Sequence, residues 1–146
     1  MFQMRKALQL ILALSIVLIA SQAYASVQPE AKALNFRVAP QTAKIGEQLF
    51  GQLYVTNLTP HVFPEGTELA FYLRGPNGFN MICDFAQIDG LAGNATRVVN
   101  FYHWFRKDSN GNDMHAGPGK YWVKAKGNLY GHEFPVESEV FQFNVN

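Results

Sequence analysis

The chain has 146 residues, and its 12 Lys and Arg against 11 Asp and Glu give a formal net charge of +1. A chain of this length forms one domain, which excludes a two-domain enzyme. A charge so close to zero also removes the electrostatic basis for nucleic-acid binding.

The first 25 residues have the pattern of a secretory signal peptide. Arg5 and Lys6 supply a basic start, residues 7–20 are an apolar run, and Ala23-Tyr24-Ala25 matches a cleavage site. We expect residues 1–25 to be removed, leaving a single domain of residues 26–146. That domain is predicted to be periplasmic or secreted, without membrane insertion, because no second apolar run approaches the roughly 20 residues of a spanning helix.

Short runs with strand character then follow one another, separated by turn residues such as those of Gly75-Pro76-Asn77-Gly78. The predicted strands cover residues 34–38, 48–56, 68–74, 79–85, 96–106, 120–126 and 139–145. Alternation of apolar and polar residues favours antiparallel sheets with one wet face. About seven such strands predict an all-β fold, an antiparallel sandwich of the Ig-like or fibronectin-III-like type.

Three pieces of sequence stand out along these strands. They comprise Gly46-Glu47 with Val55-Thr56-Asn57, then Phe63-Pro64-Glu65-Gly66 with Gly75-Pro76-Asn77-Gly78, and finally Trp104 with Asp108, Gly111 and Gly119-Lys120-Tyr121. Together they resemble the Ig-like domain of the intracellular proteinase inhibitor (BsuPI-type) family over residues 46–126. The resemblance implies an Ig-like fold and, as one option, inhibition of a protease.

Catalytic motifs are missing from the sequence, including the nucleophile elbow, the zinc-protease helix, the P-loop and the dinucleotide glycine pattern. Cys83 is the single thiol and lies in the apolar-rich run Met81-Ile82-Cys83-Asp84-Phe85. No basic neighbour in sequence lowers its pKa, so we expect a small, buried, unreactive side chain. The chain is therefore predicted not to be an enzyme and to need no cofactor.

Residues with metal-binding chemistry do not form a recognisable metal motif. The copper-type ligands are His61, His103, Met114, His115, His132 and Cys83. A blue-copper site would group Cys, His and Met near the C-terminus, and this sequence does not. Asp108, Asn110 and Asp113 match half of a calcium loop, but a tight turn at Asn110-Gly111 explains the same residues. No metal site is predicted.

The most informative feature is the outward face of one predicted strand. In residues 120–126 alternation sends Tyr121, Val123 and Ala125 inward and leaves Trp122 outward. In an Ig-like sheet this strand neighbours residues 68–74 and 139–145. The predicted binding residues are Trp122, Tyr72, Arg74, Lys124, Gln142 and Asn144. The other sheet is expected to expose a second aromatic set, namely Phe50, Tyr54, Tyr102 and Trp104.

Tyr, Trp and Arg are enriched in binding hot spots, so the sequence predicts an exported, non-catalytic binding module. Its expected partner is a protein or an envelope polymer, and a homo-oligomer would cover the same aromatic rings. One alternative is a proteinase inhibitor that acts through the loop from Arg106 to Lys120. A second alternative is a periplasmic copper-binding protein.

Overall fold

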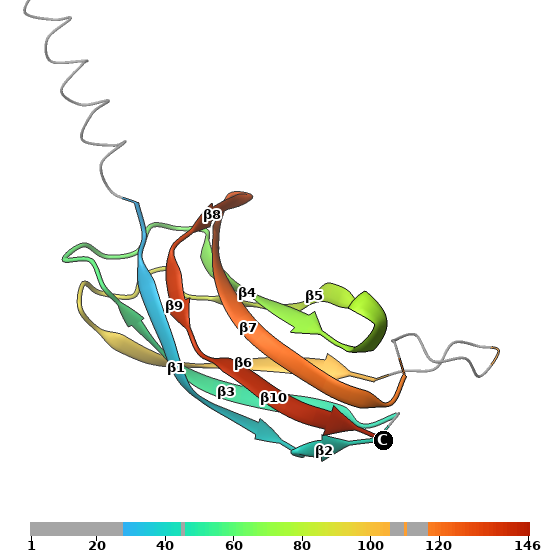
Figure 1. Cartoon of the computed structure of the whole chain (residues 1–146). Helices are drawn as coiled ribbons and strands as arrows, with labels where there is room; N and C mark the ends of the chain where they lie inside the picture. The colour runs from blue at the N-terminus through green and yellow to red at the C-terminus, as the bar shows by residue number, and fades with distance from the viewer. Residues whose placement is uncertain (1–27, 45, 106–109, 111–116) are drawn as a thin grey trace, which may run out of the picture.

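The computed structural model describes residues 28–44, 46–105, 110 and 117–146. Strands and one short 3₁₀ turn account for most of these residues (Figure 1). The elements are β1 (Ala31–Ala39), β2 (Thr42–Ala43), β3 (Gln48–Asn57), β4 (Thr67–Arg74), η1 (Pro76–Gly78), β5 (Asn80–Gln87), β6 (Thr96–Trp104), β7 (Gly119–Leu129), β8 (His132–Phe134), β9 (Val136–Ser138) and β10 (Val140–Val145).

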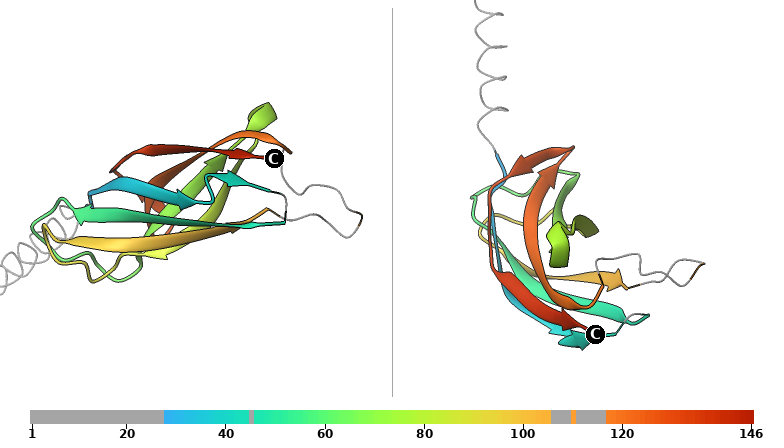
Figure 2. Two further views of the ribbon diagram at one scale, coloured as in Figure 1. Left: turned by 90° about the horizontal axis from the view of Figure 1, so that it is seen from below. Right: turned by 45° about the vertical axis from the view of Figure 1, so that its right-hand side comes forward.

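The strands form two sheets that pack face to face, which confirms the predicted Ig-like β-sandwich. The sheets are mixed rather than purely antiparallel as predicted, because β1 pairs with β9, and β2 with β10, in parallel. The four-stranded sheet has the order β6-β3-β1-β9, and the six-stranded sheet has the order β2-β10-β7-β4-β5, with β8 paired to β7. From below, β6 and β3 lie in one layer and β7 and β10 in the other (Figure 2). The seven predicted strands correspond to β1, β3, β4, β5, β6, β7 and β10. The short strands β2, β8 and β9 were not predicted, because two or three residues are too few to show an alternating pattern.

The N-terminal and C-terminal strands both change from one sheet to the other. β1 lies in the four-stranded sheet and continues into β2 of the six-stranded sheet, while β9 and β10 make the same change. β1 pairs with β9 in parallel, with Ala31 opposite Val136. β2 pairs with β10 in parallel, with Thr42 opposite Asn144. These crossings join the two sheets along one side of the sandwich.

On the opposite side, the edge strands β5 and β6 lie next to each other. The Asp84 carboxylate on β5 accepts a hydrogen bond of 2.8 Å from the backbone N–H of Tyr102 on β6. Its other oxygen accepts from the N–H of Phe85 at 2.8 Å. The pairing of β4 with β5 shifts here, and Cys83 is the residue without a partner in β4, as in a β-bulge. A bulge and a charged side chain at a sheet edge both discourage pairing with another strand.

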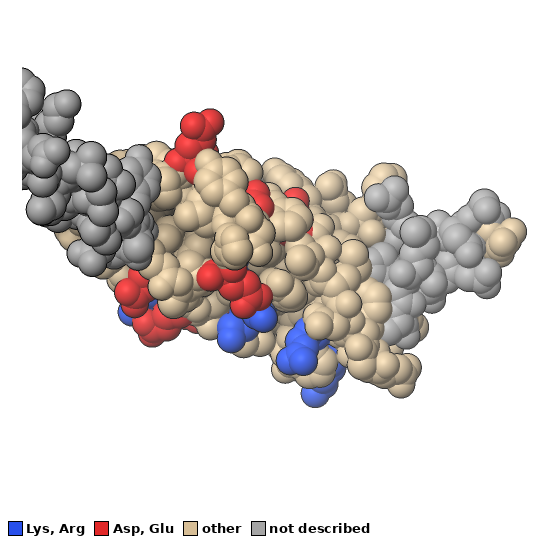
Figure 3. All heavy atoms as spheres, turned by 90° about the horizontal axis from the view of Figure 1, so that it is seen from above, with Lys and Arg blue, Asp and Glu red and all other residues tan. Residues whose placement is uncertain are grey.

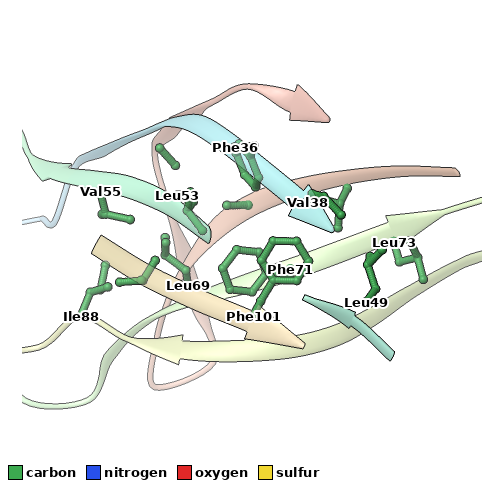
Figure 4. Close-up of a cluster of buried hydrophobic side chains, with 14 of the residues drawn as sticks. Phe36, Val38, Leu49, Leu53, Val55, Leu69, Phe71, Leu73, Ile88 and Phe101 are labelled. Carbon is green, nitrogen blue, oxygen red and sulfur yellow. The ribbon is translucent and has the colours of Figure 1, made fainter. Parts of the chain in front are cut away.

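The inward side chains of the two sheets form one apolar core (Figure 4). At its centre Phe71 of β4 stacks on Phe101 of β6, with ring centroids 4.6 Å apart. Gly51 of β3 lies under the Phe101 ring, where an added Cβ would stand 2.0 Å from a ring carbon. Only glycine therefore leaves room for Phe101 in this position, and this explains the glycine in the middle of a long strand.

Two residues of the sequence motifs, Asn57 and Tyr121, anchor loops to the core. Asn57 at the end of β3 is fully buried. Its amide donates to the carbonyl oxygens of His61 (2.7 Å) and Leu91 (3.0 Å), and its oxygen accepts from the N–H and hydroxyl of Thr59. Tyr121 of β7 is also fully buried and donates its hydroxyl to Gly117 O at 2.6 Å. Both residues fix loops to the core by satisfying buried backbone groups.

Candidate functional site

The predicted outward face is present on the six-stranded sheet, where β7 lies between β4 and β10. Trp122 and Lys124 point outward, while the intervening Val123 is buried. Trp122 pairs with Arg74 of β4 on one side and with Gln142 of β10 on the other. We call the outward residues Tyr72, Arg74, Trp122, Lys124, Gln142 and Asn144 the aromatic-basic face. All six lie where the alternation predicted them.

A hollow of about 530 Å³ opens in this face beside the turn that carries η1. Its lining consists of Tyr72, Arg74, Gly75, Gly78, Phe79, Asn80, Trp122, Lys124 and Val140. Four of the six predicted residues therefore share one cavity, whose volume is in the range of ligand pockets. Gln142 and Asn144 share the outward face but do not line the hollow. Asn144 lines a separate shallow hollow beside Lys120.

Sequence reasoning missed the contribution of the β4–β5 connection to this hollow. Gly75 packs so closely on Tyr121 that an added Cβ would lie 2.5 Å from its ring. The chain then turns through η1 and brings Phe79 and Asn80 to the border of the hollow. The glycine and proline of this turn were visible as a turn signal, but their packing on β7 was not.

Tyr72 is less free than the prediction assumed. It is half-buried, and the ammonium group of Lys126 lies 4.5 Å from the centre of its ring. Lys126 also forms an exposed ion pair of 3.6 Å with Glu133 of β8. A cation over a ring face is a favourable contact that occupies the face. Tyr72 therefore forms a wall of the hollow, and Trp122 is its more accessible ring.

The hollow has a positive character. Arg74 and Lys124 contribute two cations, and no Asp or Glu is among its described lining residues. Trp122, Phe79 and Val140 supply apolar surface beside them. This combination of ring, apolar wall and cation suits a partner that carries an anionic group next to an apolar one.

The four-stranded sheet exposes the second aromatic set, as expected. Phe50, Tyr54, Tyr102 and Trp104 are 36%, 40%, 48% and 52% exposed. Phe50 and Tyr102 are cross-strand partners with ring centroids 5.2 Å apart. The Trp104 indole N–H donates to Gly46 O at 2.9 Å, which holds its ring in place. Figure 3 shows the molecule from above, with Lys and Arg along one border of the view and Asp and Glu at several separate places.

Cys83 does not have the surroundings of a reactive thiol. It is half-buried on β5, and burial together with the neighbouring Asp84 charge raises its pKa to about 12. The thiolate is the nucleophilic form, so this cysteine is unreactive at neutral pH. The side chain is less buried than expected.

The histidines described by the structure are spread over separate elements. His103 of β6 is buried with its ring edge-on to Phe105, at a centroid distance of 4.8 Å, whereas His61 and His132 are exposed in a loop and on β8. Across the described ranges, no three His, Cys, Asp or Glu side chains are grouped as metal ligands. Met114, His115, Asp108 and Asp113 lie outside the described residues, as does most of the loop from Arg106 to Lys120.

The described part of the chain also holds no helix long and apolar enough to cross a membrane.

No family model and no characterised protein matches this chain at the level of sequence. Its fold does match solved structures. A β-glucosidase from Erythrobacter marinus aligns with a TM-score of 0.59 and 13% identity, over 81% of this chain and 16% of that one. The alkylpurine DNA glycosylase AlkC from Pseudomonas fluorescens, solved with DNA, aligns with a TM-score of 0.56 and 14% identity, over 80% and 30%.

A third match has nearly the size of this domain. The CARDB domain of a Pyrococcus furiosus protein, solved with metal ions, has a TM-score of 0.52 and 14% identity over 81% of this chain and 94% of its own. The chain spans less than a third of the length of the two enzymes. At these identities the matches define the class by fold alone, which is an Ig-like β-sandwich.

Proposed function

We propose that this chain is an exported, non-catalytic binding module that recognises a protein or an envelope polymer through the aromatic-basic face. One observation carries the proposal, namely that Trp122, Arg74 and Lys124 converge on a single hollow that has no acidic residue among its described lining. The signal-peptide pattern of residues 1–25 supports export.

The partner is expected to present an anionic group beside an apolar one. Trp122 and Phe79 would supply area that loses water on contact, which is how aromatic anchors contribute to hot spots. Arg74 and Lys124 would orient a carboxylate or phosphate, and opposite charge also accelerates association. Because the hollow is open, it suits a protruding group of a larger molecule.

Capture from an envelope extract tests the proposal. The wild-type protein is compared with the Trp122→Ala/Lys124→Ala variant, and bound partners are identified by mass spectrometry. Tyr54→Ala is the matched control, since it removes an exposed ring from the other sheet. We expect a partner that binds wild type and Tyr54→Ala but is lost from the double variant. Equal capture by all three folded proteins would refute this face as the binding site.

Protease inhibition through the loop from Arg106 to Lys120 is the alternative implied by the BsuPI-type resemblance. The motif residues with described contacts, Asn57, Tyr121 and Gly75, support the scaffold. The part of the resemblance that these residues carry therefore concerns the fold. Scrambling residues 109–113 separates the two functions, since it would abolish inhibition of a captured protease and spare binding at the hollow.

A further inference from the structure

The outer surface of β3 and β6 is uncharged along its whole length. Its ten outward positions carry side chains of two kinds, which largely alternate along the strands. Five are aromatic or apolar, namely Phe50, Tyr54, Val98, Tyr102 and Trp104, and five carry an amide or a hydroxyl, namely Gln48, Gln52, Thr56, Thr96 and Asn100. We call this surface the neutral strip. Ten outward positions without one Lys, Arg, Asp or Glu are unusual for an exposed sheet face, where charged residues keep the surface wet.

Charged groups border the neutral strip on both sides. On the β1 side, Arg37 pairs with Gln52 and Lys32 pairs with Thr56. On the β5 side, the Asp84 carboxylate sits at the backbone of Tyr102. The charges therefore stop where the strip begins, and this favours an uncharged occupant over an anionic or cationic one.

The shape of the strip is long and narrow. Its two strands have ten and nine residues, which corresponds to roughly 30 Å at the usual rise per residue. With neighbouring strands about 4.8 Å apart, the strip is roughly 10 Å wide. A globular partner centred on the strip would also cover the charged residues at its borders. A linear chain lying along the strands fits this outline better than a second globular protein.

The side chains match the two kinds of surface that a sugar unit offers. The Phe50 and Tyr102 rings, inclined by 53°, offer apolar faces to the C–H groups of a pyranose. Gln52 donates to Asn100 at 3.2 Å, which fixes both amides side by side. One mutual hydrogen bond leaves further donors and acceptors on each amide, and these suit hydroxyl groups.

We propose that the neutral strip is a second binding site, which takes an uncharged linear polysaccharide lying along β3 and β6. This site is separate from the aromatic-basic face and does not depend on the function proposed for it. The two faces lie on opposite sheets, so the domain can hold an uncharged glycan on one side and an anionic partner on the other.

Sedimentation with insoluble glycans tests the proposal. The protein expressed from the full chain is incubated with cellulose, chitin and an insoluble β-1,3-glucan, and the bound fraction is measured at 0.05 and 0.5 M NaCl. The variant Tyr54→Ala/Tyr102→Ala removes two rings of the strip, and Trp122→Ala is the control on the other sheet. Circular dichroism verifies that every variant is folded. A third variant, Gln52→Ala, serves if the double variant does not fold.

We expect retention on at least one of the three glycans, changed less than twofold by salt and by Trp122→Ala. Association should weaken at least tenfold in the double variant and at least threefold in Gln52→Ala. Retention on none of the glycans overturns the proposal, and so does equal retention of folded strip variants. The oligomeric state is measured by light scattering. A wild-type dimer that becomes monomeric in the double variant would overturn the proposal, since a second copy of the chain would then occupy the strip.

Discussion

The two outer faces of the sandwich carry the same kind of side chain in different electrostatic settings. On the six-stranded sheet, Trp122 is 36% exposed and lies between Arg74 and Gln142. On the four-stranded sheet, Phe50 has the same exposed fraction but lies on a strip without a charged group. An exposed ring by itself therefore does not indicate which kind of ligand it suits. The charged or uncharged side chains beside the ring make that distinction.

The comparison also separates the two faces by shape. The aromatic-basic face is hollowed where the η1 turn meets β7, and cations line the hollow. The neutral strip runs along two long strands and has its charges at the borders. The first arrangement suits one anionic group of a partner, and the second suits a repeating uncharged chain.

The largest expected effect comes from loosening the scaffold that both faces share. Asn57→Ala removes four hydrogen bonds at a fully buried position: the carbonyl oxygens of His61 and Leu91 each lose one donor, and the N–H of Thr59 loses its acceptor. We expect a loss of about 3 kcal/mol in the free energy of unfolding, measured by urea denaturation. The exposed Asn144→Ala is the control. A loss below 1 kcal/mol would show that other contacts hold this loop.

The second effect should separate the two faces. Neutralising both cations of the hollow with Arg74→Gln/Lys124→Gln should weaken capture of an anionic partner by about tenfold, because the partner loses its opposite charges. The neutral strip should not respond. Binding of the captured partner at 0.05 and 0.5 M NaCl supplies the readout, since screening weakens only the charged site. A partner insensitive to both salt and substitution would remove the electrostatic distinction between the faces.

A smaller effect is expected from a change at the buried Tyr121, whose ring packs against Gly75 at the hollow. Tyr121→Phe leaves the Gly117 carbonyl without its 2.6 Å donor but keeps the ring that packs under Gly75. We expect a loss of about 1 kcal/mol in the free energy of unfolding, seen as a lower thermal midpoint. Glycan retention at the neutral strip should stay unchanged at temperatures where the variant is folded. Reduced retention there would mean that the two faces are coupled through the core.

The smallest effect concerns the cover over Tyr72. Lys126→Met removes the cation 4.5 Å above the ring and keeps an apolar stem of similar length. A cation–π contact at an exposed site contributes about 0.5 kcal/mol, so stability should change little. Binding at the hollow should rise slightly, because the ring becomes accessible. A clear loss of binding would instead make Lys126 part of the recognition surface.

The sequence was most informative about side-chain directions that depend only on the alternation of residues along a strand. The period of two in residues 120–126 correctly placed Trp122 outward, and the same argument found Phe50 and Tyr102 on the other sheet. It could not show that Lys126 lies over Tyr72, because that contact joins different strands diagonally. It also could not place Phe79 in the hollow, since the position of Phe79 follows from how the η1 turn packs.

The paired N-terminal and C-terminal strands have a mechanical consequence. β1 begins at one end of the sandwich and β10 ends at the other (Figure 1), and the pairs β1–β9 and β2–β10 are parallel. A pull on the two ends of the domain would slide these strands along each other, loading their hydrogen bonds together rather than one at a time.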